Sequence, residues 1–160
     1  SWTICLFGAE LTYAGQNLRN FSFDKDTQNI SRRYRDFISI LIMSLIAKRF
    51  ERNEPPYTAE EISEEHQIPI RLTNQTLYQL QEINLIHEVV TDQKSEEIAY
   101  QPSMDLNQLN VAVVLDRLDT YGSENFKIDK EVEFSDEWRI LVESREEYYK
   151  KASKVLLKEL

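Results

Sequence analysis

The feature that most constrains the fold of this chain is a series of three amphipathic segments joined by short turns between residues 31 and 85. In the first segment, apolar side chains recur at helical spacing after Ser31, a plausible N-cap, and the pattern continues to Arg52. The paired prolines at 55 and 56 end this helix, because proline cannot continue one. The apolar stripe consists of Tyr34, Phe37, Ile38, Leu41, Ile42, Leu45, Ile46 and Phe50.

The second and third segments are shorter and lie close together in the sequence. Thr58 begins a capping box with Glu61, which predicts a short helix that ends near His66. Pro69 is well placed at the start of the next helix, which is expected over residues 71–82. Two helices joined by a short turn, after a first long helix, predict a helix-turn-helix arrangement.

After Asn84 the apolar period changes from that of a helix to that of a strand. Residues 86–90 and 97–101 alternate in part between apolar and polar side chains, and the polar stretch 91–96 separates them. This pattern predicts a β-hairpin, or wing. The expected fold is therefore mainly α with a small β-hairpin: a winged helix-turn-helix domain plus flanking helices.

Two further helices are expected after the hairpin. Asp105 or Asn107 can cap the first, which Gly122 ends, and the last begins at about Ser135 and folds back along the domain. These elements predict a winged-helix domain over residues 31–122 and a linker with a C-terminal helix over residues 123–160, preceded by a basic and polar connector over residues 19–30. Residues 1–18 are assigned to the end of a transmembrane helix by the family resemblance described below.

The chain has a net charge of −9, and the charge is unevenly distributed. Residues 19–52 carry a net charge of +4, residues 54–101 carry −8, and residues 102–160 carry −4. The single cysteine, Cys5, cannot form an internal disulfide, so an oxidising compartment is not required. Basic residues are thus concentrated ahead of the helix-turn-helix, and acidic residues within it.

Residues 2–15 form an apolar run with one acid, Glu10. The run is shorter than the roughly 20 residues that a membrane-spanning helix needs. From composition it is either the end of a longer span, followed by the basic flank that the positive-inside rule predicts, or an amphipathic helix that docks on the domain.

The opening SWTICLFGAELTYAGQN, with Gly8-Ala9, Glu10 and Gln16-Asn17, resembles the last transmembrane segment of the YihY/BrkB family. These are polytopic bacterial inner-membrane proteins, many of them described as ribonuclease BN. The resemblance implies a protein of the bacterial inner membrane that contacts the bilayer through residues 1–18 and upstream, with the rest in the cytoplasm. Glu10 is then a candidate membrane-embedded functional residue. The alternative is that Glu10 lies at the cytoplasmic surface of the membrane and is solvated.

Residues 58–118 resemble the winged-helix part of IscR-type repressors. The resemblance rests on T-x-x-E-I-S in the second helix, an Ile-Pro before the third, L-x-x-x-N-L-I at its end, and LNQLNVAVVLDRL after the wing. The chain lacks the cysteines that would hold an iron–sulfur cluster, so no cofactor is expected.

DNA binding is one function that a winged helix suggests, and the third helix offers Arg71, Asn74, Gln75 and Gln79 as candidates to read bases. Affinity for DNA requires Lys and Arg to neutralise phosphates, and the block that contains this helix has a net charge of −8. We therefore expect a protein partner or self-association and argue against nucleic acid as a partner.

Catalysis is also not expected. A metal-dependent ribonuclease needs clustered ligands, whereas the two histidines, His66 and His87, stand outside any such cluster, so neither a metal site nor catalytic residues are predicted. The sequence interpretation is a non-enzymatic, cytoplasmic regulatory or interaction module at the C-terminus of a YihY/BrkB-like membrane protein. The alternatives are a DNA-binding transcriptional regulator and a tRNA-processing ribonuclease.

Overall fold

The computed structural model describes residues 29–92, 94 and 96–160. The predicted membrane segment 1–18, Glu10 and most of the connector 19–30 lie outside these residues. Within the described part, no helix is both long enough and apolar enough to cross a membrane.

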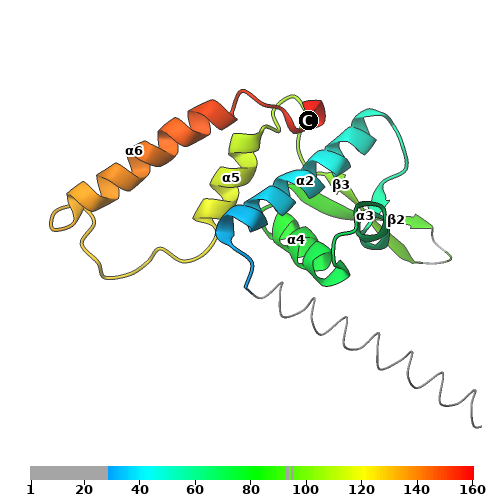
Figure 1. The fold of residues 1–160 in the computed structure, drawn as a ribbon, viewed down its shortest axis with the longest axis horizontal. Coiled ribbons are helices and arrows are strands. Elements are labelled where there is room, and N and C mark those ends of the chain that lie inside the picture. The colour runs from blue at the N-terminus through cyan, green and yellow to red at the C-terminus, as the bar shows by residue number, and fades with distance from the viewer. Residues whose placement is uncertain (1–28, 93, 95) are drawn as a thin grey trace, which may run out of the picture.

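Helix α2 (Arg32–Glu51) occupies the middle of the molecule and contacts α4, α5, β3 and η1 (Figure 1). It begins where expected, because the Ser31 hydroxyl accepts a hydrogen bond from the Tyr34 amide at 3.2 Å. The side chains of Ile42, Met43 and Ile46 are almost fully buried along its inner face. The helix stops before Asn53, which has a φ of 56°.

The predicted helix-turn-helix is confirmed as α3 (Ala59–His66) and α4 (Ile70–Glu82). Thr58 caps α3 by accepting a hydrogen bond from the Glu61 amide at 3.2 Å. The turn between the helices is tight because Gln67 adopts a left-handed conformation and the Ser63 hydroxyl donates to the Ile68 carbonyl at 2.6 Å. These contacts fix the direction in which α4 leaves the turn.

The predicted hairpin is present as β2 (Ile86–Asp92) and β3 (Glu97–Pro102), in antiparallel register with Val89 opposite Ala99. A third strand, β1 (Tyr57–Thr58), pairs with the other edge of β3 and gives the order β1-β3-β2. The sequence did not predict β1, because two residues are too few to show an alternating pattern. β1 holds the start of α3 against the wing.

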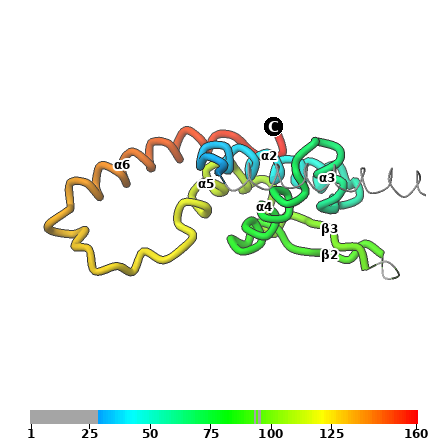
Figure 2. Tube along the Cα trace, turned by 60° about the horizontal axis from the view of Figure 1, so that its bottom comes forward, coloured from blue at the N-terminus to red at the C-terminus, as the bar shows by residue number. Residues whose placement is uncertain are grey.

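The later helices are α5 (Val111–Thr120) and α6 (Ser135–Ala152). The predicted cap of α5 was wrong: Asn110 accepts the hydrogen bond from the Val113 amide at 3.0 Å. Asp105 instead accepts a hydrogen bond from the Asn107 amide in the preceding turn. Figures 1 and 2 show α6 reaching away from the other elements, with its C-terminal end returning to them.

The end of the chain is part of the core. The short 3₁₀ helix η1 (Leu157–Glu159) places the Leu157 side chain, with 0% exposure, in the cluster formed by α2, α3, α4 and the sheet. The Leu157 amide donates a hydrogen bond to the Leu109 carbonyl at 3.1 Å. The Lys158 ammonium forms an ion pair with the Glu51 carboxylate, with 3.6 Å between nitrogen and oxygen. Residues 157 and 158 therefore connect α2 with the segment that precedes α5.

Candidate nucleic-acid interface

Helix α4 presents one polar stripe to the outside. Its inner face buries Leu72, Leu77 and Leu80, and the opposite face exposes side chains at helical three-and-four spacing. Along most of its length the exposed face is polar. The stripe consists of Arg71, Asn74, Gln75 and Tyr78.

Three of the four side chains singled out from the sequence, Arg71, Asn74 and Gln75, therefore lie together on the outer face of α4. Gln79 does not, because it is half-buried and turns toward a cleft with α2 and α5. Tyr78 was missed, although it is 65% exposed. Its position four residues after Asn74 could have identified it as a member of the stripe.

Helix α4 begins without a side-chain cap. Its N-cap is Pro69, which makes no side-chain capping hydrogen bond. The first-turn amides of a helix have no partner within the helix, and the helix dipole adds partial positive charge there. An exposed helix start of this kind can accept a phosphate oxygen.

Basic side chains from α2 flank α4. Arg32, Arg33 and Arg35 are exposed in the first turn of α2. Arg35 and Gln75 line the same cleft of about 390 Å³ between the two helices. The folded chain thus brings positive charge from the basic block of the sequence to the side of α4.

Arg49, near the other end of α2, neutralises part of the acidic block. Its guanidinium lies 3.0 Å from Glu61, 3.6 Å from Glu65 and 3.9 Å from Glu54. It also stacks 3.5 Å from the centre of the Tyr57 ring. Charges counted along the sequence therefore overstate the negative charge that this region shows to a ligand.

The wing keeps an acidic character. Glu88, Asp92, Glu96 and Glu97 are exposed on or beside its strands, and Lys94 is its one basic residue. Phosphates that approach the wing meet net negative charge. Close contact with a nucleic acid is therefore favoured at α4 and the start of α2, and disfavoured at the wing.

A group of charged residues joins α2, α5 and α6 behind α4. Asp119 accepts a hydrogen bond from the Tyr149 hydroxyl and pairs with Arg145 at 3.4 Å. Burial, followed by the hydrogen bond to Asp119, raises the pKa of Tyr149. Burial and the nearby Asp119 carboxylate raise the pKa of Asp36, against the opposing effect of Arg32.

The raised pKa of Asp36 predicts how stability changes in an Asp36→Asn variant. An aspartate whose pKa is higher in the folded state than in the unfolded state loses stability as pH rises through that folded pKa. Because asparagine carries no charge, the variant should have a higher melting temperature than the wild type at pH 7. The difference should disappear as the pH falls below the ordinary aspartate pKa of 3.8, because Asp36 is then protonated in both states. Melting curves across this pH range are the measurement, and a variant less stable at pH 7 would contradict it.

The two histidines lie apart from α4's exposed stripe. His66 is near Glu65 at 3.9 Å and packs edge-on against Tyr57, and His87 is within hydrogen-bonding distance of the Ser103 hydroxyl at 3.2 Å. Among the described residues, no group of three or more His, Cys, Asp or Glu side chains could hold a metal ion.

Comparison with known proteins finds similar solved structures. No family model matches the sequence, and no curated protein matches it. IscR of T. potens superposes with a TM-score of 0.56 at 13% identity, over 82% of this chain and 85% of that one. CymR (YrzC), the global cysteine regulator of B. subtilis, superposes with a TM-score of 0.54 at 13% identity, over 81% of this chain and 93% of that one. A putative transcriptional regulator from Listeria innocua superposes with a TM-score of 0.53 at 11% identity, over 78% of this chain and 81% of that one.

These matches correct several sequence interpretations. The assignment to a YihY/BrkB-like inner-membrane protein, with its membrane partner and ribonuclease label, is wrong, because the matching structures are regulators of the IscR and CymR type. The expectation that nucleic acid is not a partner is contradicted as well, because the matching structures are IscR, CymR and a putative transcriptional regulator. None of these regulators is named as an enzyme, which agrees with the expectation of a non-enzymatic protein.

The described part of the chain has the mainly helical winged-helix fold of these regulators, with a three-stranded antiparallel sheet.

Proposed function

We propose that this chain is a DNA-binding transcriptional regulator that reads its site by placing α4 in the major groove. The observation that carries the proposal is the exposed polar stripe of α4, flanked by the arginines that begin α2. The second helix of a helix-turn-helix is the element that enters the major groove in known complexes. The likeness to IscR, CymR and a putative transcriptional regulator supports the same function.

The side chains of the stripe suit direct readout of bases. Asn74 and Gln75 each carry a side-chain amide that can make two hydrogen bonds to adenine. Arg71 carries a guanidinium group that can donate two hydrogen bonds to guanine. All three lie in the first half of α4, which is the half that reaches base edges in helix-turn-helix proteins. Sequence preference would come from these residues.

Phosphate contacts would come from two neighbouring elements. Arg35 lines a cleft with Gln75 of α4, and Arg32 and Arg33 are exposed with it in the first turn of α2. The uncapped start of α4 supplies backbone amides for a further phosphate. Such contacts position the protein on the duplex without specifying its sequence.

The acidic wing should limit affinity, and this can be tested by charge reversal. We expect the double variant Glu88→Lys, Glu97→Lys to bind DNA more tightly, by roughly tenfold for each phosphate that a new lysine neutralises near physiological salt. The measurement is fluorescence anisotropy with a labelled duplex. The matched control is the double variant Glu143→Lys, Glu147→Lys, which makes the same change in net charge at exposed positions of α6, a helix that lies away from the wing (Figure 1). Equal tightening in the control would mean that net charge alone is responsible.

The proposal itself is tested by selection from a library of random duplexes with the full chain. A DNA-binding regulator should enrich a defined sequence over successive rounds. The same selection with Asn74→Ala, Gln75→Ala should lose or relax that sequence. A wild-type chain that enriches no sequence, at low salt as well as at physiological salt, would overturn the proposal.

A further inference from the structure

A groove of about 360 Å³ lies between the start of α2 and the turn that joins α3 to α4. Two aromatic side chains are open to solvent in it, because Tyr34 is 50% exposed and Phe37 is 53% exposed. Their rings lie 5.6 Å apart, measured between centres. The other apolar residues of the lining come from both sides of the groove and are Ile30, Ile38, Leu41, Ile68, Pro69 and Leu72. An exposed apolar surface of this kind is typical of an interaction site.

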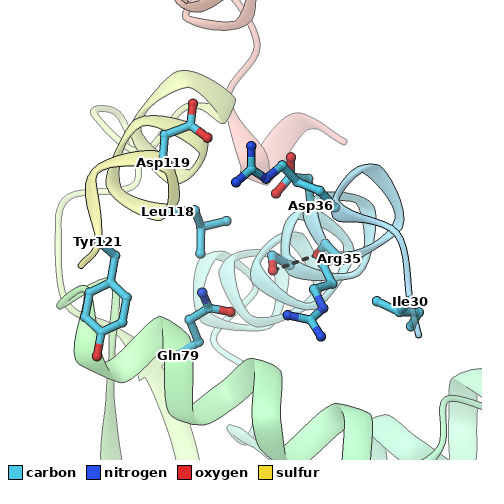
Figure 3. Close-up of a pocket in the computed structure, with 9 residues that line it drawn as sticks. Ile30, Arg35, Asp36, Gln79, Leu118, Asp119 and Tyr121 are labelled. Atoms are coloured by element: carbon cyan, nitrogen blue, oxygen red, sulfur yellow. Dashed lines mark hydrogen bonds between the residues drawn. The ribbon is translucent and has the colours of Figure 1, made fainter. Parts of the chain in front are cut away.

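The groove lies where the N-terminal part of the chain joins the domain. Ile30 lines it, and residues 1–28 come almost directly before Ile30 in the sequence. Ile30 also lines the cavity between α2, α4 and α5. Figure 3 shows that this cavity is surrounded by charged side chains, among them Arg35, Asp36 and Asp119. Of these two sites next to Ile30, the groove is the one whose lining is mainly apolar.

The N-terminal part of the chain contains an apolar segment that matches the groove in chemistry. Residues 2–15 hold six large apolar side chains and one charged residue, Glu10. Residues 16–29 connect this segment to Ile30, and a connector of that length averages only about 20 Å end to end even as a random coil. A connector this short keeps the apolar segment near the groove, at an effective concentration in the millimolar range.

We propose that residues 2–15 dock in this groove of their own chain and cover Tyr34 and Phe37. Docking removes apolar surface from water on both sides of the contact, which is the driving force for it. A second copy or another protein with an equally apolar segment lacks the connector, so it would need a millimolar concentration to compete. The chain's own segment is therefore the favoured occupant.

The groove borders the surface assigned to DNA, so the second part of the inference rests on the proposed function. Pro69 lines the groove and is also the N-cap of α4, whose first-turn amides are assigned to a phosphate. A segment docked beside Pro69 competes with the DNA backbone for this space. Release of the segment should therefore raise DNA affinity. A segment that is docked in about nine chains of ten would lower the affinity about tenfold.

Docking is tested first without DNA, by nuclear magnetic resonance with a spin label on Cys5, the only cysteine of the chain. In the isotope-labelled full chain, the spin label should broaden the amide signals of Tyr34, Phe37 and Leu72. The signals of residues 136–141, in the first half of α6, should stay sharp. The same sample with the spin label reduced is the reference. Sharp signals at the groove, or equal broadening at the groove and in α6, would overturn the inference.

A mixed sample identifies the copy that supplies the segment. It combines a spin-labelled chain without isotope labelling and an isotope-labelled chain without the spin label. Docking within one chain predicts that the groove signals stay sharp in this mixture. Broadening at the groove would assign it to the apolar segment of a second copy, which contradicts the proposal.

Variants test the contact without a spin label. Phe7→Ser, Leu11→Ser should release the apolar segment and lower the melting temperature by about 3–5 °C, for a segment docked in about nine chains of ten. Phe37→Ala should also lower the melting temperature of the wild type, but it should have no further effect once the segment has been released. Phe126→Ala is the matched control, because Phe126 is 68% exposed and lies outside the groove, and it should leave the melting temperature unchanged. Additive losses from the segment variant and Phe37→Ala would show that the two sites are independent and would refute docking.

DNA titrations then distinguish this inference from the proposed function. Phe7→Ser, Leu11→Ser keeps the net charge and should bind DNA about tenfold more tightly than the wild type. Unchanged affinity in this variant would refute the competition with DNA. Docking in a chain that binds no DNA would retain the groove contact and refute the proposed function. DNA binding by a chain whose groove signals stay sharp would retain the proposed function and refute the docking.

Discussion

Replacing Leu157 with alanine is expected to lower the free energy of unfolding by about 2–5 kcal/mol, the usual cost of truncating a buried leucine. Leu157 has 0% exposure and packs in the core, although it lies only three residues from the end of the sequence. Its truncation leaves a cavity beside α2 and removes the packing that holds η1 in place. At a loss of roughly 2–4 °C per kcal/mol for a chain of this size, the melting temperature should fall clearly.

Leu160→Ala is the matched control for this variant. Leu160 is 51% exposed and lies in the same terminal segment, so its truncation should leave stability nearly unchanged. Urea unfolding of both variants measures the difference. If Leu157→Ala and Leu160→Ala unfold at the same midpoint as the wild type, then η1 is not part of the core.

The double variant Asn74→Ala, Gln75→Ala is expected to lose DNA affinity at the preferred sequence by roughly 10–100-fold or more. Each bidentate contact to a base contributes about 1–3 kcal/mol of discrimination. Because neither side chain is charged, binding to unrelated DNA and the salt dependence of binding should change little. Anisotropy titrations with the selected duplex and with a scrambled one measure both effects.

The control for this variant removes the same two residue types elsewhere. Asn125 and Gln108 are exposed and lie outside α4, so Asn125→Ala, Gln108→Ala should bind both duplexes like the wild type. If the α4 variant keeps its affinity and its preference for the selected duplex, another surface of the protein reads the DNA.

Local chemistry explains why much of the fold was predictable. The caps at Ser31 and Thr58 and the change of period after Asn84 are properties of neighbouring residues, and the structure contains the helices and strands that they indicate. β1 and η1 were missed because each depends on partners far away in the sequence. Leu157 follows a stretch rich in lysine, which gives no sign that its side chain enters the core.

The candidate interface was predictable only in part. The helical spacing of Arg71, Asn74 and Gln75 placed them on one face, and the structure exposes that face. The charge of the interface was misjudged, because Arg49 pairs with glutamates up to 16 positions away and Arg35 lies beside Gln75 across two helices. Such pairings are set by tertiary packing and leave no pattern in the sequence.

The salt dependence of binding to the selected duplex tests the central claim most directly. If α4 and the start of α2 dock on DNA, the logarithm of the affinity should fall steeply and linearly with the logarithm of salt concentration. The triple variant Arg32→Ala, Arg33→Ala, Arg35→Ala should reduce that slope by up to about three, at roughly 0.9 for each phosphate that is no longer neutralised. The triple variant Lys150→Ala, Lys151→Ala, Lys154→Ala makes the same change in net charge in the last turn of α6 and just after it, and it should keep the wild-type slope. A wild-type chain without a salt-dependent affinity, or an equal slope in the wild type and the arginine variant, would contradict the account.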